Sequence, residues 1–169
     1  PSVFIPVAEQ IGLIDKLGNL ILRRACIETR PLDPIKLAVN ISAVQFMQPG
    51  FVSSVREILE TTGFPPARLE LEITEGVFRN DTVRTRDIIA KLRSLGVRIA
   101  LDDFGTGFSS MAYLRDFPLD RIKIDRSFIG GLLVDRDCAS IVKFVIGLAR
   151  DLGMSVTAEG VETKEQLSY

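Results

Sequence analysis

The segment Leu69-Glu70-Leu71-Glu72-Ile73-Thr74 alternates aliphatic and polar side chains. Because successive side chains along a β-strand point to opposite faces, this pattern predicts a strand with one aliphatic and one polar face. The same alternation recurs in four other segments, 36–42, 97–102, 121–125 and 155–159. The aliphatic face of each predicted strand suits packing under helices, whereas the polar face carries its acids near the carboxyl end.

Segments with helical spacing of apolar residues separate the predicted strands. They cover residues 4–30, 51–61, 82–95, 110–115 and 135–152, and a further helix begins at 163. Alternation of strands and helices predicts an α/β fold with parallel strands. A doubly wound sheet buries both faces and has continuously apolar strands. Five strands with one polar face instead predict a TIM-like (β/α) barrel, whose catalytic groups lie at the carboxyl ends of its strands.

Polar residues recur near the predicted strand ends at intervals of about 30 residues, the length of one strand–helix unit. We expect them to converge on one mouth of the barrel: Asn40, Glu72, Asp102, Lys123, Asp125 and Glu159. A single Asp or Asn at a strand end is usually a turn residue or a helix N-cap. Five strands that all end in an acid, an amide or a lysine are poorly explained as independent caps.

Other polar residues receive structural interpretations. Thr82 and Asp135 are interpreted as helix caps. Glu70 and Arg98 lie lower on the polar face, where an internal ion pair is the favoured interpretation.

The chemistry of the predicted mouth follows from its oxygen donors. Clustered carboxylates cannot all remain ionised without cations nearby. An Asn beside Glu and Asp offers ligands that suit Mg²⁺ or Mn²⁺, and consecutive Asp102 and Asp103 can bridge two ions or divide between them. Two metal ions are the usual device for attack of water on a phosphodiester. Lys123, between carboxylates, is placed to steady the attacking water or the developing charge.

Composition excludes several other classes of protein. The chain has 169 residues, 21 Lys and Arg against 22 Asp and Glu, and a net charge of −1. This length suggests one domain, short of the roughly 250 residues of a complete TIM barrel. The near-neutral charge argues against binding to a DNA or RNA duplex. No histidine is present, which excludes Ser–His nucleophiles and His-ligated zinc.

Location is predicted from the same composition. No apolar run approaches the roughly 18 residues of a membrane span, and no secretory leader is recognisable. Two cysteines make no disulfide framework and fit a reducing cytosol, so a cytoplasmic location is expected, with membrane anchoring of a larger parent protein left open.

Six stretches in this order resemble the EAL-domain family, the bacterial cyclic di-GMP phosphodiesterases. They are Phe4-Ile5-Pro6-Val7-Ala8-Glu9, Val39-Asn40-Ile41-Ser42, Glu72-Ile73-Thr74-Glu75, Asp102-Asp103-Phe104-Gly105-Thr106-Gly107-Phe108-Ser109-Ser110, Lys123-Ile124-Asp125-Arg126-Ser127-Phe128 and Ala158-Glu159-Gly160-Val161-Glu162-Thr163. The resemblance covers essentially the whole chain. It implies a TIM-like barrel that binds cyclic di-GMP and opens it to linear pGpG with two Mg²⁺ or Mn²⁺ ions.

The resemblance also implies roles for individual residues. Metal ligation is implied for Asn40, Glu72, Asp102 and Asp103, and catalytic roles near the attacking water for Lys123, Asp125 and Glu159. Glu75 would anchor the loop that contains Gly105, Thr106 and Gly107, and Glu162 would support the same rim. The family further suggests a homodimer, and a parent protein that carries sensor or GGDEF-type domains.

Both ends of the chain depart from the family pattern. The Glu-Ala-Leu strand, whose glutamate is a metal ligand in the family, and the closing strand with its Gln-Gly segment are absent from residues 1–169. We therefore expect an EAL domain fragment with about five of the eight barrel strands of the fold. Because one ligand is missing, we expect this chain alone to be poorly active. A non-catalytic cyclic di-GMP receptor and a purely structural partner remain alternatives.

Overall fold

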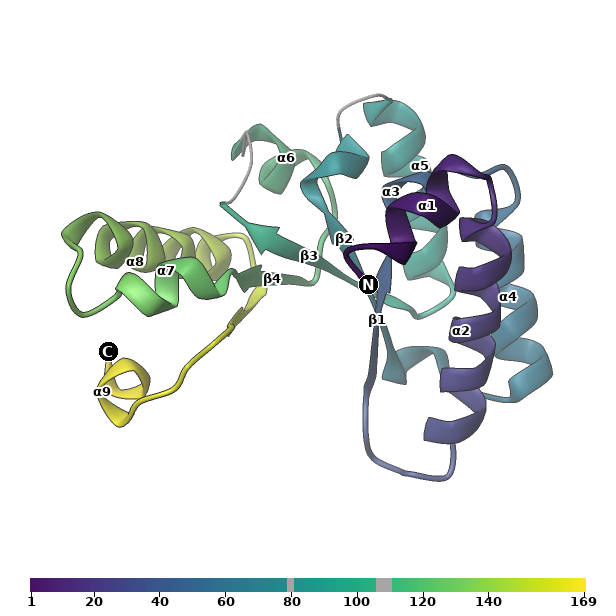
Figure 1. The fold of residues 1–169 in the computed structure, drawn as a ribbon, viewed down its shortest axis with the longest axis horizontal. Helices are drawn as coiled ribbons and strands as arrows, with labels where there is room; N and C mark the ends of the chain where they lie inside the picture. Colours follow the sequence, from purple (N-terminus) through teal and green to yellow (C-terminus); the bar gives the residue numbers. More distant parts are fainter. Residues whose placement is uncertain (79–80, 106–110) are drawn as a thin grey trace. The chain divides into compact units, whose positions relative to one another are not determined.

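A computed structural model describes residues 1–78, 81–105 and 111–169 of the chain. Two compact units are present, Pro1–Ile99 and Ala100–Tyr169. Within the described ranges, five strands follow the chain order β1-β2-β3-β4-β5 in one sheet. The pairs β1–β2, β3–β4 and β4–β5 are parallel. The α/β class and the parallel five-strand sheet expected from the sequence are thereby confirmed (Figure 1).

The first unit contains the N-terminal helices and two complete strands. Its elements are α1 (Phe4–Gln10), α2 (Ile14–Thr29), β1 (Leu37–Ile41), α3 (Ala43–Phe46), α4 (Phe51–Thr62), η1 (Pro66–Arg68), β2 (Leu69–Thr74), η2 (Glu75–Phe78) and α5 (Thr82–Ser94). The segment with helical spacing over 4–30 forms two helices, α1 and α2. Gly12 lies between them with φ +70°, a conformation that glycine adopts without strain and that ends helix α1.

The aliphatic face predicted for β2 forms the core of the first unit. Leu69, Leu71 and Ile73 are all fully buried. Glu70 and Glu72, on the opposite face, are also buried. The expected ion pair is present, because Arg98 Nε lies 3.6 Å from Glu70 Oε2.

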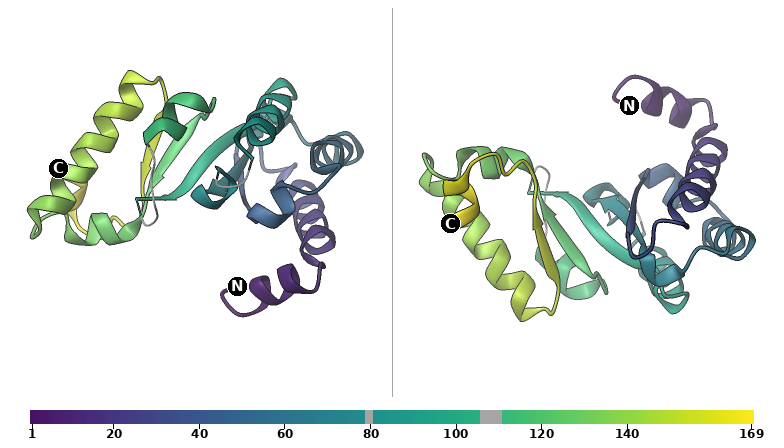
Figure 2. Two further views of the ribbon diagram at one scale, coloured as in Figure 1. Left: turned by 90° about the horizontal axis from the view of Figure 1, so that it is seen from above. Right: turned by 90° about the horizontal axis from the view of Figure 1, so that it is seen from below.

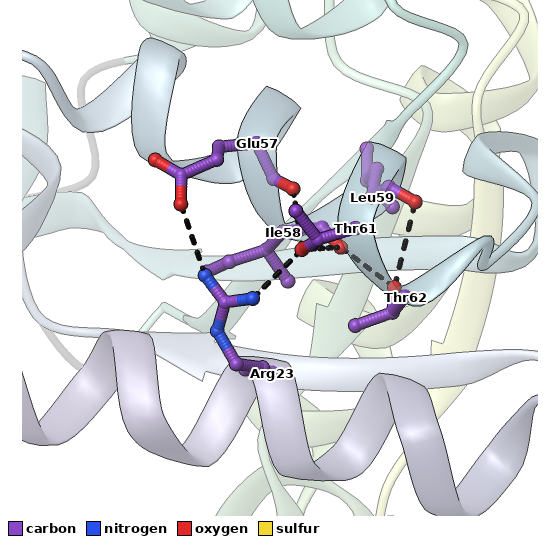
Figure 3. A network of polar contacts seen from close by, with 6 residues as sticks. All are labelled: Arg23, Glu57, Ile58, Leu59, Thr61 and Thr62. Atoms are coloured by element: carbon purple, nitrogen blue, oxygen red, sulfur yellow. Dashed lines mark hydrogen bonds and ion pairs between the residues drawn. The ribbon is translucent and has the colours of Figure 1, made fainter.

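Helices α2 and α4 lie side by side in the first unit (Figure 1). Arg23 of α2 joins them, because its guanidinium donates to Thr61 Oγ1 at 2.7 Å and to Glu57 Oε1 at 3.2 Å (Figure 3). The Thr61 hydroxyl donates in turn to the Glu57 carbonyl at 2.7 Å. These hydrogen bonds connect the surfaces of α2 and α4.

The second unit contains the later strands with their helices. Its elements are α6 (Met111–Asp116), β4 (Arg121–Ile124), α7 (Arg126–Gly131), α8 (Arg136–Asp151), β5 (Ser155–Ala158) and α9 (Lys164–Ser168), and it includes most of β3 (Arg98–Phe104). Helix α8 runs along β4 and β5 in both views of Figure 2. It buries Val142, Val145 and Ala149, while β4 buries Ile122 and Ile124.

Two helix starts test the expected caps. Asp135 is the N-cap of α8, and its side chain accepts a hydrogen bond from the Asp137 N–H, as expected. The expectation for Thr82 is wrong, because Asp81 is the N-cap of α5 and accepts from the Arg84 N–H at 2.9 Å. Both residue types cap helices well, so the local sequence does not decide between the adjacent positions. Among the described residues, no helix combines the length and the apolar character that crossing a bilayer requires.

Candidate metal centre

A bulge in β3 shapes the candidate site. Leu101 pairs with Ile122 and Phe104 pairs with Ile124, so Asp102 and Asp103 together face one residue of β4, Lys123. Asp103 has φ +52°, in the left-handed region that Asp tolerates better than most residues. In a regular strand, two consecutive side chains point to opposite faces. A bulge re-aims one of them, and here it lets both carboxylates serve one site.

Asp102, Asp103 and Glu159 form an acidic cluster in the second unit. Each offers one carboxylate oxygen, and these three oxygens lie within 4.8 Å of one another. Asp102 comes from β3 and Glu159 directly follows β5. The sequence predicts both residues at a common mouth, and the structure brings them together.

Lys123 of β4 lies between two of these acids. Its Nζ atom is 2.8 Å from Asp102 Oδ1 and 2.7 Å from Glu159 Oε1. The lysine side chain is 12% exposed and that of Asp102 is 10% exposed, so solvent screens this contact weakly. One ammonium group therefore partly neutralises a cluster of carboxylates.

The acidic cluster fits a divalent cation. Burial raises the pKa of Asp103, and the neighbouring charges of Asp102, Asp125 and Glu159 raise it further, while Lys123 opposes them. Within the part of the chain that the structure describes, buried Asp102 Oδ1 accepts no aligned hydrogen bond, although Lys123 is at ion-pair distance. Mg²⁺ and Mn²⁺ prefer oxygen ligands such as these carboxylates. A bound cation would also relieve the repulsion between their negative charges.

Glu159 is held by backbone contacts on either side of it. Its N–H donates to the Ile124 carbonyl at 3.0 Å, which extends the β4–β5 pairing by one residue. Gly160 follows with φ +71°, and a Cβ atom there would lie 2.8 Å from Arg126 Cβ. Glycine at position 160 therefore allows the backbone that follows Glu159 to pass close to α7.

Asn40 and Glu72 form a pair in the first unit. They are register partners on the parallel strands β1 and β2, which places their side chains on one face. Asn40 is exposed and Glu72 is buried. That these two residues share one metal centre with Asp102 and Asp103 stays a prediction.

Asp125 has a structural role at the end of β4. It is the N-cap of α7 and accepts a hydrogen bond from the Ser127 N–H at 2.9 Å. The hydrogen bonds from the Ser127 side chain and backbone lower the pKa of Asp125. A catalytic contribution of Asp125 stays a prediction beside this capping role.

The remaining predicted rim residues lie on loops and short turns. Gly105 has φ +98° and packs so closely on Phe128 that a Cβ atom would lie 2.7 Å from the ring. Glu75 begins the η2 turn, and Glu162 is exposed, with its N–H donating to Gln166 Oε1. Thr106 and Gly107 lie outside the described residues.

The sequence pattern indicates Lys123 between carboxylates, but its alternation does not indicate the bulge in β3. The adjacent pair Asp102-Asp103 was a signal for the bulge, because a regular strand would direct one of the two acids toward the covering helices.

Parallel strands with an acidic, lysine-bridged cluster at their carboxyl ends define a barrel-type α/β domain with a candidate metal centre. The sequence profile described as "EAL domain" matches residues 1–169. The chain belongs to the EAL domain family.

Curated relatives and solved structures agree with this assignment. An uncharacterized signaling protein of Caulobacter vibrioides is 49% identical over 100% of this chain and 21% of its own length. The cyclic di-GMP phosphodiesterase NbdA of Pseudomonas aeruginosa is 41% identical over 100% of this chain and 22% of its own length. The solved PaMucR phosphodiesterase in complex with c-di-GMP has a TM-score of 0.92 and 42% identity, covering 99% of this chain and 70% of that one. The chain thus spans about a fifth of the length of the curated relatives.

Proposed function

We propose that this chain carries the phosphodiesterase centre of a protein that hydrolyses cyclic di-GMP to linear pGpG with two divalent cations, Mg²⁺ or Mn²⁺. The observation that carries the proposal is the approach of Asp102, Asp103 and Glu159 within 4.8 Å, with Lys123 bridging two of them. Membership of the EAL domain family and relatives named as cyclic di-GMP phosphodiesterases support the choice of substrate.

The proposed ligands are Asn40, Glu72, Asp102 and Asp103, with Glu159 at the centre where water attacks. Bound cations would supply charge for the phosphodiester and lower the pKa of water. The carboxylates hold hard cations, and their own mutual repulsion is relieved when they do so. The same cations reconcile an acidic mouth with an anionic substrate.

Lys123 contributes a positive charge that does not depend on the cations. Held by Asp102 and Glu159, its ammonium group is oriented before substrate arrives. A preorganised cation stabilises negative charge that develops on the phosphodiester oxygens at little cost in reorganisation. We assign Lys123 to positioning the attacking water and to this stabilisation.

Chromatography of reaction products tests the proposal directly. The purified protein that carries this chain is incubated with cyclic di-GMP and Mg²⁺ or Mn²⁺, with a chelator in a parallel sample. The expected result is pGpG that disappears with chelator and in the Asp102→Asn and Glu159→Gln variants. The Glu165→Gln variant, an exposed acid of α9, is the matched control and should retain full turnover.

Together with a calorimetric titration of cyclic di-GMP, which measures binding, the same experiment separates the alternatives. Binding of cyclic di-GMP without product would overturn the enzymatic proposal in favour of a receptor. Absence of both binding and product would instead favour a structural partner. Turnover that resists chelator would reject the metal-assisted route.

A further inference from the structure

A second basic residue of β4 makes a contact that repeats the geometry of Lys123. Arg121 Nη1 donates a hydrogen bond to Thr157 Oγ1 of β5 at 2.7 Å, in a partly buried position. The strand register pairs Arg121 with Ser155 and Lys123 with Thr157. Each basic side chain thus extends diagonally to the residue two positions beyond its register partner, Thr157 for Arg121 and Glu159 for Lys123.

The Arg121–Thr157 contact and the Lys123–Glu159 contact lie on the same face of the sheet, two residues apart along both chain segments. Arg121 and Lys123 are two residues apart on β4, and Thr157 and Glu159 are two apart along β5 and the residue that follows it. Side chains two apart in a strand share a face. The guanidinium of Arg121 therefore lies against Thr157, the register partner of Lys123, on the face of the sheet that carries Lys123.

This arrangement restricts the directions open to Lys123. A lysine side chain has a flexible four-carbon stem and loses rotamer freedom when its ammonium group is fixed. A second cation on the same face disfavours conformations in which the ammonium group turns toward the Arg121 guanidinium. The direction that remains leads to Asp102 and Glu159, where the ammonium group is found.

Thr157 contributes rigidity as well as a hydrogen bond. It is β-branched, so its χ1 angle is restricted in a strand. Its hydroxyl accepts from Arg121, and this bond connects β4 to β5 two residues before Glu159. The contact therefore lies next to both partners of the Lys123–Glu159 ion pair, because Thr157 is the register partner of Lys123 and lies two residues before Glu159.

We infer that Arg121 and Thr157 are positioning residues that hold Lys123 against Asp102 and Glu159. The catalytic consequence of this inference rests on the proposed phosphodiesterase function. The placement of Lys123 does not, and it can be measured without turnover.

The test uses the protein that carries this chain, with chelator present, and an amine-acetylating reagent. The rate at which Lys123 is acetylated is followed by peptide mass spectrometry, with exposed Lys143 of α8 as the internal reference. The Thr157→Val variant removes the hydroxyl, and Thr157→Ser restores it. We expect Thr157→Val to raise the rate at Lys123 about fivefold or more, since the lysine is no longer confined. Thr157→Ser keeps the hydroxyl but not the β-branch and should return the rate most of the way to the wild-type value.

A matched control is available in the first unit. Thr61 accepts an equally short hydrogen bond from Arg23, at 2.7 Å, but joins helices α2 and α4 (Figure 3). Thr61→Val therefore removes the same kind of bond and should leave the acetylation rate of Lys123 unchanged. The Arg121→Gln variant, which keeps a donor and removes the charge, replaces Thr157→Val if that variant does not fold.

Steady-state kinetics gives the second readout. Thr157→Val should lower kcat for cyclic di-GMP about tenfold with little change in KM, because the substrate still binds while Lys123 is misplaced. An unchanged acetylation rate of Lys123 in Thr157→Val, or in Arg121→Gln where that variant replaces it, would overturn the inference whatever the kinetics. A wild-type protein without turnover, but with the expected acetylation pattern, would overturn the proposed function and leave the positioning role intact.

Discussion

Asp102 and Asp103 are adjacent in the chain, yet a bulge in β3 brings a carboxylate oxygen of each within 4.8 Å of the other. Asp103 reaches this position with φ +52°. Its backbone conformation and its carboxylate are separate contributions to the site. Substitutions can remove one contribution and keep the other.

Replacement of Asp103 by glycine should keep the bulge and remove the carboxylate. Glycine adopts a positive φ without strain, and loss of one acid relieves repulsion within the cluster. We expect the unfolding midpoint to stay the same or rise slightly. Mn²⁺ affinity, measured by calorimetric titration, should fall about tenfold or more.

Two controls complete this prediction. Asp151→Asn, at the exposed end of α8, should leave Mn²⁺ affinity unchanged. Asp103→Val should destabilise the fold, because a β-branched residue is strained at positive φ. Wild-type Mn²⁺ affinity in Asp103→Gly would show that this carboxylate is no ligand.

Gly105 and Gly147 should respond in opposite ways to substitution by alanine. Gly105 has φ +98°, and a Cβ atom would lie 2.7 Å from Phe128 Cε2. Gly147 lies within α8 with nothing within 4 Å of such an atom. We expect Gly105→Ala to lower the free energy of unfolding by about 1–3 kcal/mol. Gly147→Ala should raise it by about 0.5–1 kcal/mol.

Urea denaturation of both variants measures the two shifts. The double variant Gly105→Ala with Phe128→Leu should recover part of the loss, because leucine relieves the contact while the backbone strain remains. Equal stability of Gly105→Ala and the wild type would mean that the loop can move away from Phe128 without cost.

Arg68 should contribute strongly to the stability of the first unit. Its guanidinium donates to the carbonyls of Thr29, Arg30, Leu32 and Ile35 at 2.7–3.1 Å. It also lies 5.0 Å from the centre of the Phe64 ring. Lysine cannot reproduce this fork of donors. We expect Arg68→Lys to lower the free energy of unfolding by about 2–3 kcal/mol in urea denaturation.

The ion pair of Arg68 with Asp33 supplies the matched control. Asp33 is 79% exposed and 3.6 Å from the guanidinium, so its contribution is small. Asp33→Asn should change stability by less than about 1 kcal/mol. A larger loss in Asp33→Asn than in Arg68→Lys would show that the ion pair, and not the carbonyl contacts, stabilises this region.

The sequence predicted the layers of the fold because the aliphatic side chains of a strand share one face. Leu69, Leu71 and Ile73 are fully buried, as the two-residue period requires. The approach of Asp102 to Glu159 also followed, since carboxyl ends of parallel strands meet at one edge of a sheet. Both features follow from the alternation of side chains within each strand and from the parallel direction of the strands.

Other features depend on contacts that no single segment contains. The bulge arises where two residues of β3 meet one residue of β4, so the register of both strands decides it. Helix α7 was not predicted, because its six residues include Gly130 and Gly131, which have low helix propensity. Asp125 as its N-cap was the available signal. The Arg121–Thr157 bond depends on side-chain reach across two strands, which alternation does not specify.

Stability in acid should depend on the charge of Asp135. This side chain caps α8 and accepts hydrogen bonds from the Asp137 N–H and from Cys138, which lower the pKa of Asp135. A carboxyl group with a lower pKa in the folded chain stabilises the fold above its unfolded pKa of about 3.9. This contribution is lost as the pH falls through the folded pKa.

The Asp135→Asn variant keeps a capping oxygen and removes the titration. Its deficit in free energy of unfolding should therefore be largest at pH 7 and should shrink as the pH falls below about 4. Urea denaturation at successive pH values measures this deficit. Asp135→Ser, a second neutral cap, should show the same pH dependence as Asp135→Asn. A deficit that stays constant between neutral and acid pH would mean that the hydrogen bonds of the cap, and not its charge, stabilise α8, because only the charge is lost on protonation.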